Sequence, residues 1–231
     1  MTTADAPERH LLVTDCDGTI TRRDFFWLVV EAFAPAHLEE HWRAYEEKRI
    51  THFEALAGIF DKLQVSEDAM NALLDRAEPD PEMKTWLNHL DRGGWDVVVV
   101  SAGCSWYIER ILARVGVTLP VFANPGTFTP GGGVHMRLPT DSPYFSRELG
   151  IDKAAVVREA QESGRIVAFA GDGFPDADAA RLVPAELRFA RADLAKALRA
   201  EGLAFRAFER WGEVAASLVH LGLEAGHCEK S

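Results

Sequence analysis

Short, mainly apolar segments alternate along this chain with longer segments in which apolar residues recur every three or four positions. The short segments span residues 11–14, 95–101, 165–170 and 187–190. Short apolar runs bounded by turn residues are typical of buried strands, whereas the three- to four-residue spacing is typical of amphipathic helices. Because the two kinds alternate, we predict an α/β fold, a Rossmann-like doubly wound parallel sheet covered by helices on both faces.

The remaining segments extend this prediction. We expect short strands over residues 121–124 and, at the sheet edge, 205–208, a helix ending at Leu182, and further helices over 83–92, 105–115, 152–162, 192–201 and 211–221. The stretch PGTFTPGGGVHMRLP predicts a small β-hairpin, and residues 141–150 predict a loop. Ala102 and Gly103 are expected to turn the strand over 95–101 into the helix that follows it.

Residues 24–78 differ from the rest of the chain, because helical spacing continues there without any strand pattern. The spacing predicts helices over 25–33, 38–49, 52–63 and 67–77, and Pro35 and Ser66 stand where helices could begin. This all-helical stretch separates the first strand from the others. We therefore predict a core domain formed by residues 1–22 and 80–231, and a helical cap domain formed by residues 23–79.

Composition narrows the range of partners. The chain has 231 residues, of which 47% are hydrophobic, and a net charge of −11. This acidic balance argues against binding to nucleic acid or to an anionic membrane. The first ten residues lack a basic flank with an apolar stretch, and no apolar run approaches the length of a membrane span. The three cysteines show neither metal-ligand spacing nor a disulfide framework. We therefore expect a cytoplasmic protein.

Two carboxylates follow the first predicted strand, in the sequence Asp15-Cys16-Asp17-Gly18-Thr19. Two such groups in an apolar setting repel each other unless a cation or a shared ligand offsets the repulsion. A surface turn would use the same residue types. The buried strand before them favours a ligand site, because open α/β sheets bind ligands at the carboxyl ends of their strands.

Three further positions carry candidate chemistry. Ser101 ends the second strong strand, and the helix start after it offers backbone N–H groups for an anion, although a plain helix cap would also place a serine there. Lys153 stands at a helix start, where the helix dipole opposes it, so it either faces solvent or serves an anion. Asp172 and Asp176 follow the strand over 165–170; a helix cap would explain Asp176, but not Asp172 between its glycines.

Taken in order, these positions resemble the four sequence motifs of the haloacid dehalogenase superfamily, most of whose members with this aspartate pair are phosphatases. The resemblance implies that Asp15 is the nucleophile and that Asp17 is the general acid and base. It also implies a Mg²⁺ site formed by Asp15, the backbone carbonyl of Asp17, and Asp172. Asp176 would then support the shell of the metal.

The same resemblance implies a phosphate site formed by Ser101, Ala102, Gly103 and Lys153. The helical stretch resembles the small cap of the subclass that includes phosphoserine phosphatase. The segments GTITRRD, KRITHFEALAGIF and FRAFERWGEV resemble the methionine-salvage phosphatases that act on 2-hydroxy-3-keto-5-methylthiopentenyl 1-phosphate.

These resemblances imply a Mg²⁺-dependent phosphomonoester hydrolase that acts through an aspartyl phosphate on a small phosphorylated metabolite, as a monomer or homodimer. Asp24, Phe25, Trp27 and Arg49 are candidates for contact with the substrate from the cap, although solvated charges or cap core are equally consistent with their residue types. Two alternatives remain open. One is a phosphatase or phosphotransferase acting on phosphoserine or another metabolite, and the other is a catalytically idle relative that binds a ligand or partner.

Overall fold

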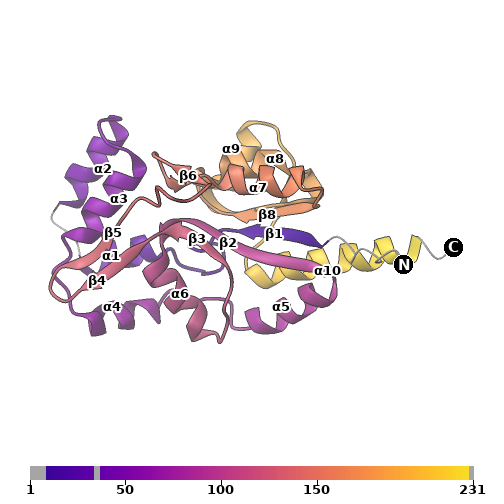
Figure 1. Cartoon of the computed structure of the whole chain (residues 1–231), viewed down its shortest axis with the longest axis horizontal. Helices are drawn as coiled ribbons and strands as arrows, with labels where there is room; N and C mark the ends of the chain where they lie inside the picture. The colour runs from indigo at the N-terminus through magenta and orange to yellow at the C-terminus, as the bar shows by residue number, and fades with distance from the viewer. Residues whose placement is uncertain (1–8, 34–36, 229–231) are drawn as a thin grey trace.

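A six-stranded parallel sheet forms the centre of the structure, a computed structural model that describes residues 9–33 and 37–228 (Figure 1). Its strand order is β10-β9-β8-β1-β2-β3, and each neighbouring pair is parallel. The strands are β1 (His10–Thr14), β2 (Trp95–Cys104), β3 (Val121–Asn124), β8 (Val167–Gly171), β9 (Arg188–Ala190) and β10 (Arg206–Ala207). The predicted doubly wound parallel sheet is confirmed.

Helices cover both faces of this sheet. Figure 1 shows α7 (Lys153–Glu162), α8 (Ala177–Leu182) and α9 (Ala192–Ala200) on one side, and α5 (Met83–Arg92), α6 (Ser105–Arg114) and α10 (Trp211–Cys228) on the other. Alternate residues of β1 enter different cores, because successive side chains of a strand point to opposite faces. Leu12 packs in the core with α5, α6 and α10, whereas Leu11 and Val13 pack with α7, α8 and α9.

The end of β2 differs from the prediction. The turn expected at Ala102 and Gly103 is wrong, because β2 continues to Cys104. Beyond an irregularity in register, Cys104 is again paired with Asn124 of β3. The Asn124 side chain also donates a hydrogen bond to the Ala102 carbonyl at 2.7 Å. These tertiary contacts hold extended a segment whose local sequence predicts a turn.

The helical stretch forms α1 (Phe25–Phe33), α2 (Leu38–Glu46), α3 (His52–Asp61) and α4 (Glu67–Leu74). Ser66 begins α4 as predicted, since its hydroxyl accepts a hydrogen bond from the Ala69 N–H at 3.2 Å; Pro35 lies outside the described residues. The two connections to the sheet run side by side, because Thr21 and Pro79 form an antiparallel bridge.

The predicted hairpin is present as β4 (Gly126–Thr129) and β5 (Gly133–Met136). Its turn contacts the helical stretch, since the Gly131 N–H donates to the Val65 carbonyl at 3.3 Å. A second small antiparallel pair, β6 (Phe145–Ser146) and β7 (Gly150–Ile151), lies where a loop was predicted.

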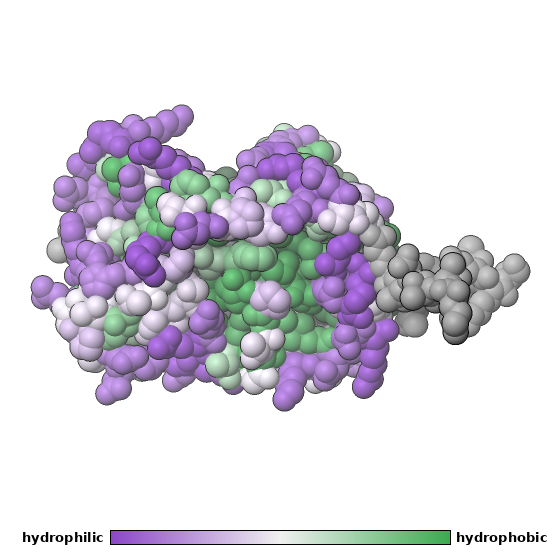
Figure 2. All heavy atoms as spheres, viewed as in Figure 1, coloured by the Kyte–Doolittle hydropathy of each residue, from purple (hydrophilic) through white to green (hydrophobic). Residues whose placement is uncertain are grey.

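The surface follows this layered build. Figure 2 shows apolar side chains gathered near the centre of this face and hydrophilic ones around its margin. Within the part of the chain that the structure describes, no helix combines the length and the apolar character that a membrane span requires.

Candidate active site

Three neighbouring strands bring the predicted site residues together. β1 lies between β2 and β8, and the three run parallel, so Asp15, Ser101 and Asp172 meet at the carboxyl edge of the sheet. The start of α7 adds Lys153 to the same place. Asp15 and Ser101 are buried, and so is Lys153, which is 3% exposed.

Lys153 joins two of the aspartates. Its Nζ donates hydrogen bonds to Asp15 Oδ1 at 2.7 Å and to Asp176 Oδ1 at 2.5 Å. Burial alone would lower the pKa of Lys153, but the charges and hydrogen bonds of the two carboxylates outweigh it and raise that pKa above its usual value. Lys153 is therefore a buried cation with two anionic partners, and the alternative of a solvent-facing lysine is wrong.

We expect Lys153→Met to lower the free energy of unfolding by about 3–5 kcal/mol, because loss of one partner leaves buried carboxylates without their cation. Urea denaturation in the presence of a chelator measures this effect. Lys196→Met is a matched control. It removes an ion pair with Asp193 of the same 2.7 Å N···O distance at the surface, where the Lys196 side chain is 73% exposed. The free energy of unfolding should fall by less than about 1 kcal/mol. Equal losses in the two variants would contradict the buried-pair role.

Three carboxylates form an acidic cluster beside this lysine. Asp15, Asp172 and Asp176 each offer an oxygen within 4.8 Å of the others. Burial, followed by the charges of Asp15 and Asp176, raises the pKa of Asp172 to about 9. Burial likewise raises the pKa of Asp15 to about 6, although Lys153 opposes it. A divalent cation would offset this crowding, and an all-oxygen donor set suits Mg²⁺. The residues present therefore fit the metal that the resemblance implied.

The three carboxylates are not equally available. Asp176 Oδ1 accepts from Lys153, and Asp176 Oδ2 accepts from the Asp172 and Gly173 N–H groups, each at 2.9 Å. Asp172 has a weaker side-chain contact, with the Thr19 hydroxyl at 3.4 Å. Asp176 is thus held by the protein on both oxygens, which suits a supporting role better than direct binding of a cation.

Gly18 allows this cluster to close. It has a φ of +67°, which favours glycine, and a Cβ at this position would lie 2.1 Å from Asp172 Oδ2. The turn after β1 can therefore approach Asp172 only with a glycine.

The carboxyl of Asp17 is held by groups outside the acidic cluster. Its Oδ2 accepts a hydrogen bond from the Tyr107 hydroxyl at 2.5 Å, and its Oδ1 accepts one from the Phe25 N–H at 3.1 Å. Burial and the neighbouring charge of Asp24 raise the pKa of Asp17 well above its usual value. Sequence reasoning missed Tyr107, although its place in the first turn of the helix after the Ser101 segment was a signal.

Ser101 lies inside β2 rather than at a helix cap, because the residue that caps α6 is Cys104. The Ser101 hydroxyl accepts a hydrogen bond from the Gly103 N–H at 3.0 Å. Ser101, Ala102 and Gly103 therefore form an extended, buried segment beside Asp15. Their role in phosphate binding stays a prediction.

The four cap candidates occupy different environments. Asp24 caps α1, since its Oδ1 accepts from the Phe26 N–H at 2.7 Å. Phe25 is fully buried, and its ring packs against Tyr107 with 4.6 Å between the ring centroids. It therefore lies in the core of the cap, and its contact with a substrate stays a prediction. Trp27 is 55% exposed and remains available for contact.

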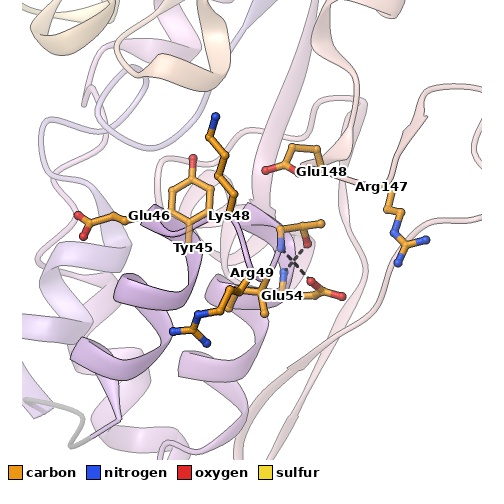
Figure 3. Close-up of a pocket in the computed structure, with 9 residues that line it drawn as sticks. Tyr45, Glu46, Lys48, Arg49, Glu54, Arg147 and Glu148 are labelled. Atoms are coloured by element: carbon orange, nitrogen blue, oxygen red, sulfur yellow. Dashed lines mark hydrogen bonds between the residues drawn. The ribbon is translucent and has the colours of Figure 1, made fainter.

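Arg49 lines a separate pocket of ≈ 640 Å³. Figure 3 shows it on the same side as Tyr45 and Lys48, with Arg147 and Glu148 across the pocket. Arg49 forms an ion pair with Glu47 at 2.7 Å. The pocket mixes acidic and basic groups, so its lining gives no clear preference for an anion.

Comparisons with known proteins agree with the geometry. The family model of the haloacid dehalogenase-like hydrolases matches residues 12–181. The bifunctional enzyme MtnB/MtnX of Bacillus licheniformis is 27% identical over 213 residues; the match covers 89% of this chain and 48% of that protein, so the chain spans about half its length. The 2-hydroxy-3-keto-5-methylthiopentenyl-1-phosphate phosphatase of Exiguobacterium sibiricum is 24% identical over 207 residues, covering 88% of this chain and 93% of that protein.

A solved structure shares the fold. The probable phosphoserine phosphatase of Vibrio cholerae matches with a TM-score of 0.67 and 18% sequence identity. The match covers 94% of this chain and 66% of that chain.

Proposed function

This chain belongs to the haloacid dehalogenase-like hydrolase family and is a phosphatase, and from this premise we propose that it hydrolyses a small phosphorylated metabolite through an aspartyl phosphate on Asp15. The observation that carries the proposal is the buried bridge from Lys153 to Asp15 and Asp176, with Asp172 beside it. A buried nucleophilic carboxylate, a fixed cation and a metal-binding cluster are what transfer of a phosphoryl group requires.

In this proposal each side chain has a distinct task. Lys153 holds Oδ1 of Asp15 and leaves the second oxygen to attack phosphorus in line. Asp17 donates a proton to the leaving oxygen as the P–O bond breaks, and then takes a proton from the water that hydrolyses the aspartyl phosphate. The hydroxyl of Ser101 and the N–H groups after it bind the phosphoryl oxygens.

Asp15, Asp172 and the Asp17 carbonyl would hold Mg²⁺, and Asp176 would keep the cluster in place through its three hydrogen bonds. A cation held by these residues would supply positive charge that offsets the repulsion between the carboxylates and the phosphate.

We propose further that residues 23–79 act as a cap that selects the leaving group. The charges that act most strongly on Asp17 come from Asp24 and Asp15, both acidic, so a leaving group that carries its own carboxylate is disfavoured beside it. Trp27 is exposed and offers an apolar surface on α1, the helix that Asp24 caps. These features favour 2-hydroxy-3-keto-5-methylthiopentenyl 1-phosphate, the compound named for the relatives, over phosphoserine.

A panel of phosphomonoesters tests the function and the ranking together. We expect phosphate release from p-nitrophenyl phosphate, and a higher kcat/KM for 2-hydroxy-3-keto-5-methylthiopentenyl 1-phosphate than for phosphoserine. Absence of turnover with every substrate would favour the catalytically idle alternative. If phosphoserine proves the better substrate, the specificity proposal fails while the phosphatase assignment stands.

The contribution of Asp24 to substrate choice is measured as the ratio of kcat/KM for 2-hydroxy-3-keto-5-methylthiopentenyl 1-phosphate to kcat/KM for phosphoserine. Asp24→Asn keeps a side chain that can cap α1 but removes the charge beside Asp17, so we expect it to change the kcat/KM ratio of the two substrates. Asp68→Asn is the matched control, because Asp68 also lies at the start of a helix of this segment, in the first turn of α4, but is exposed. A ratio that moves equally in both variants, or in neither, would rule out Asp24 as a determinant.

A further inference from the structure

The carboxyl of Asp17 is held from two sides. Tyr107, in the first turn of α6, donates its hydroxyl to Oδ2, and the N–H of Phe25, the first residue of α1, binds Oδ1. One donor therefore comes from a helix that covers the sheet, and the other from the helical segment between Thr21 and Pro79. Both donors leave the side chain of Asp17 with little freedom to rotate.

Tyr107 itself has no room to move. It is 1% exposed, and its ring packs against both Phe25, at 4.6 Å, and Phe60, at 6.2 Å between centroids. Gly103 forms the opening through which its hydroxyl reaches the acid, since a Cβ there would lie 1.9 Å from that hydroxyl and 3.0 Å from Asp17 Oδ2. The lack of a side chain at Gly103 and the fixed position of the Tyr107 ring thus both allow the hydrogen bond from Tyr107 to Asp17.

This contact is not explained by stability alone. A buried tyrosine hydroxyl needs a hydrogen-bond partner, and any acceptor of suitable geometry meets that need. Here the partner is the one carboxyl to which we assign proton transfer. The hydrogen bond is charge-assisted when Asp17 is ionised, and such bonds are short and directional.

We infer that the Tyr107 hydroxyl is a positioning group for Asp17, which fixes the carboxyl in the orientation from which it gives its proton to the leaving oxygen. The inference rests on the proposed function, since it takes Asp17 as the general acid. Tyr107 does not touch the phosphoryl group in this account. It acts through Asp17 alone.

The test is Tyr107→Phe, which keeps the stacked ring and removes only the hydroxyl. The readout is kcat/KM, because it reports the steps up to departure of the leaving group. For an alkyl phosphate such as glycerol 2-phosphate, whose leaving oxygen must be protonated, we expect a fall of about 10- to 100-fold, the worth of one charge-assisted hydrogen bond. For p-nitrophenyl phosphate, whose leaving group departs without a proton, we expect a fall of less than about 3-fold.

Two further variants make the result decisive. Tyr144→Phe is the matched control, because the hydroxyl of Tyr144 also interacts with a carboxylate, the one of Glu159. Tyr144 packs on Phe122 and is far from Asp17 in the chain. This variant should change neither kcat/KM value. Asp17→Asn should show the same preference for p-nitrophenyl phosphate, with a larger fall of about 100- to 10,000-fold for the alkyl phosphate.

The outcomes separate the inference from the function beneath it. If Tyr107→Phe lowers both values equally, or neither, while Asp17→Asn loses the alkyl phosphate, the positioning role is overturned and the acid remains Asp17. If Asp17→Asn keeps full activity on the alkyl phosphate, the assignment of the acid fails, and the inference fails with it.

Discussion

The variant Asp15→Asn is expected to release no measurable phosphate from any phosphomonoester, with a loss of more than about 10⁴-fold in kcat, as is typical when a nucleophile is removed. The amide of Asn cannot replace the carboxylate as nucleophile, so the covalent phosphoryl intermediate that water hydrolyses does not form. The substitution also removes the charge that Lys153 binds at 2.7 Å. Steady-state phosphate release measures the loss.

The control for this variant is Asp178→Asn. Asp178 belongs to α8, close in the chain to the acidic cluster, but its side chain is 85% exposed and pairs with Arg181. It should leave kcat unchanged. A beryllofluoride mimic of the phosphoryl group should attach to Asp15 in the unaltered protein. An active Asp15→Asn enzyme, or a mimic bound to another residue, would show that the nucleophile lies elsewhere.

Removal of divalent cations is expected to abolish turnover, and addition of Mg²⁺ to restore it. The cause is electrostatic: burial, followed by the charges of Asp15 and Asp176, raises the pKa of Asp172 to about 9, and Lys153 is already engaged by Asp15 and Asp176. Without a cation, an anionic phosphate would meet further negative charge at this edge. Phosphate release in excess chelator, followed by back-titration with Mg²⁺, measures the dependence.

A second readout does not depend on activity. Mg²⁺ that binds the folded protein should raise its Tm by mass action. Asp172→Asn should lose this rise, whereas Asp178→Asn should keep it. Full turnover in excess chelator, or a Tm rise that survives Asp172→Asn, would remove Asp172 from the metal site.

Much of the site could be predicted from sequence because it depends on strand ends. The apolar run before Asp15 and the one before Asp172 each fix where a buried strand stops. In a parallel sheet these ends share one edge, so residues distant in sequence meet without any knowledge of their contacts. Lys153 followed from the resemblance, but its burial did not, since a lysine in a first helical turn is equally at home in solvent.

The contacts that sequence reasoning missed all depend on close tertiary approach. The extension of β2 to Cys104 depends on pairing with Asn124 across the chain. The contact of Tyr107 with Asp17 depends on the missing Cβ of Gly103. The burial of Phe25 depends on the ring of Tyr107 beneath it. No periodicity along one segment carries this information, because each contact is specified by two segments at once.

The bridge between Thr21 and Pro79 has a consequence for how the chain folds. β1 must pair with β2 across the whole helical segment, His10 opposite Trp95, and closing a long loop costs more entropy than closing a short one. Once Thr21 and Pro79 are paired, the helical segment no longer adds to the length of the loop that pairing of β1 with β2 must close. Early formation of this junction should therefore speed formation of the sheet, and weakening it should slow refolding more than it speeds unfolding.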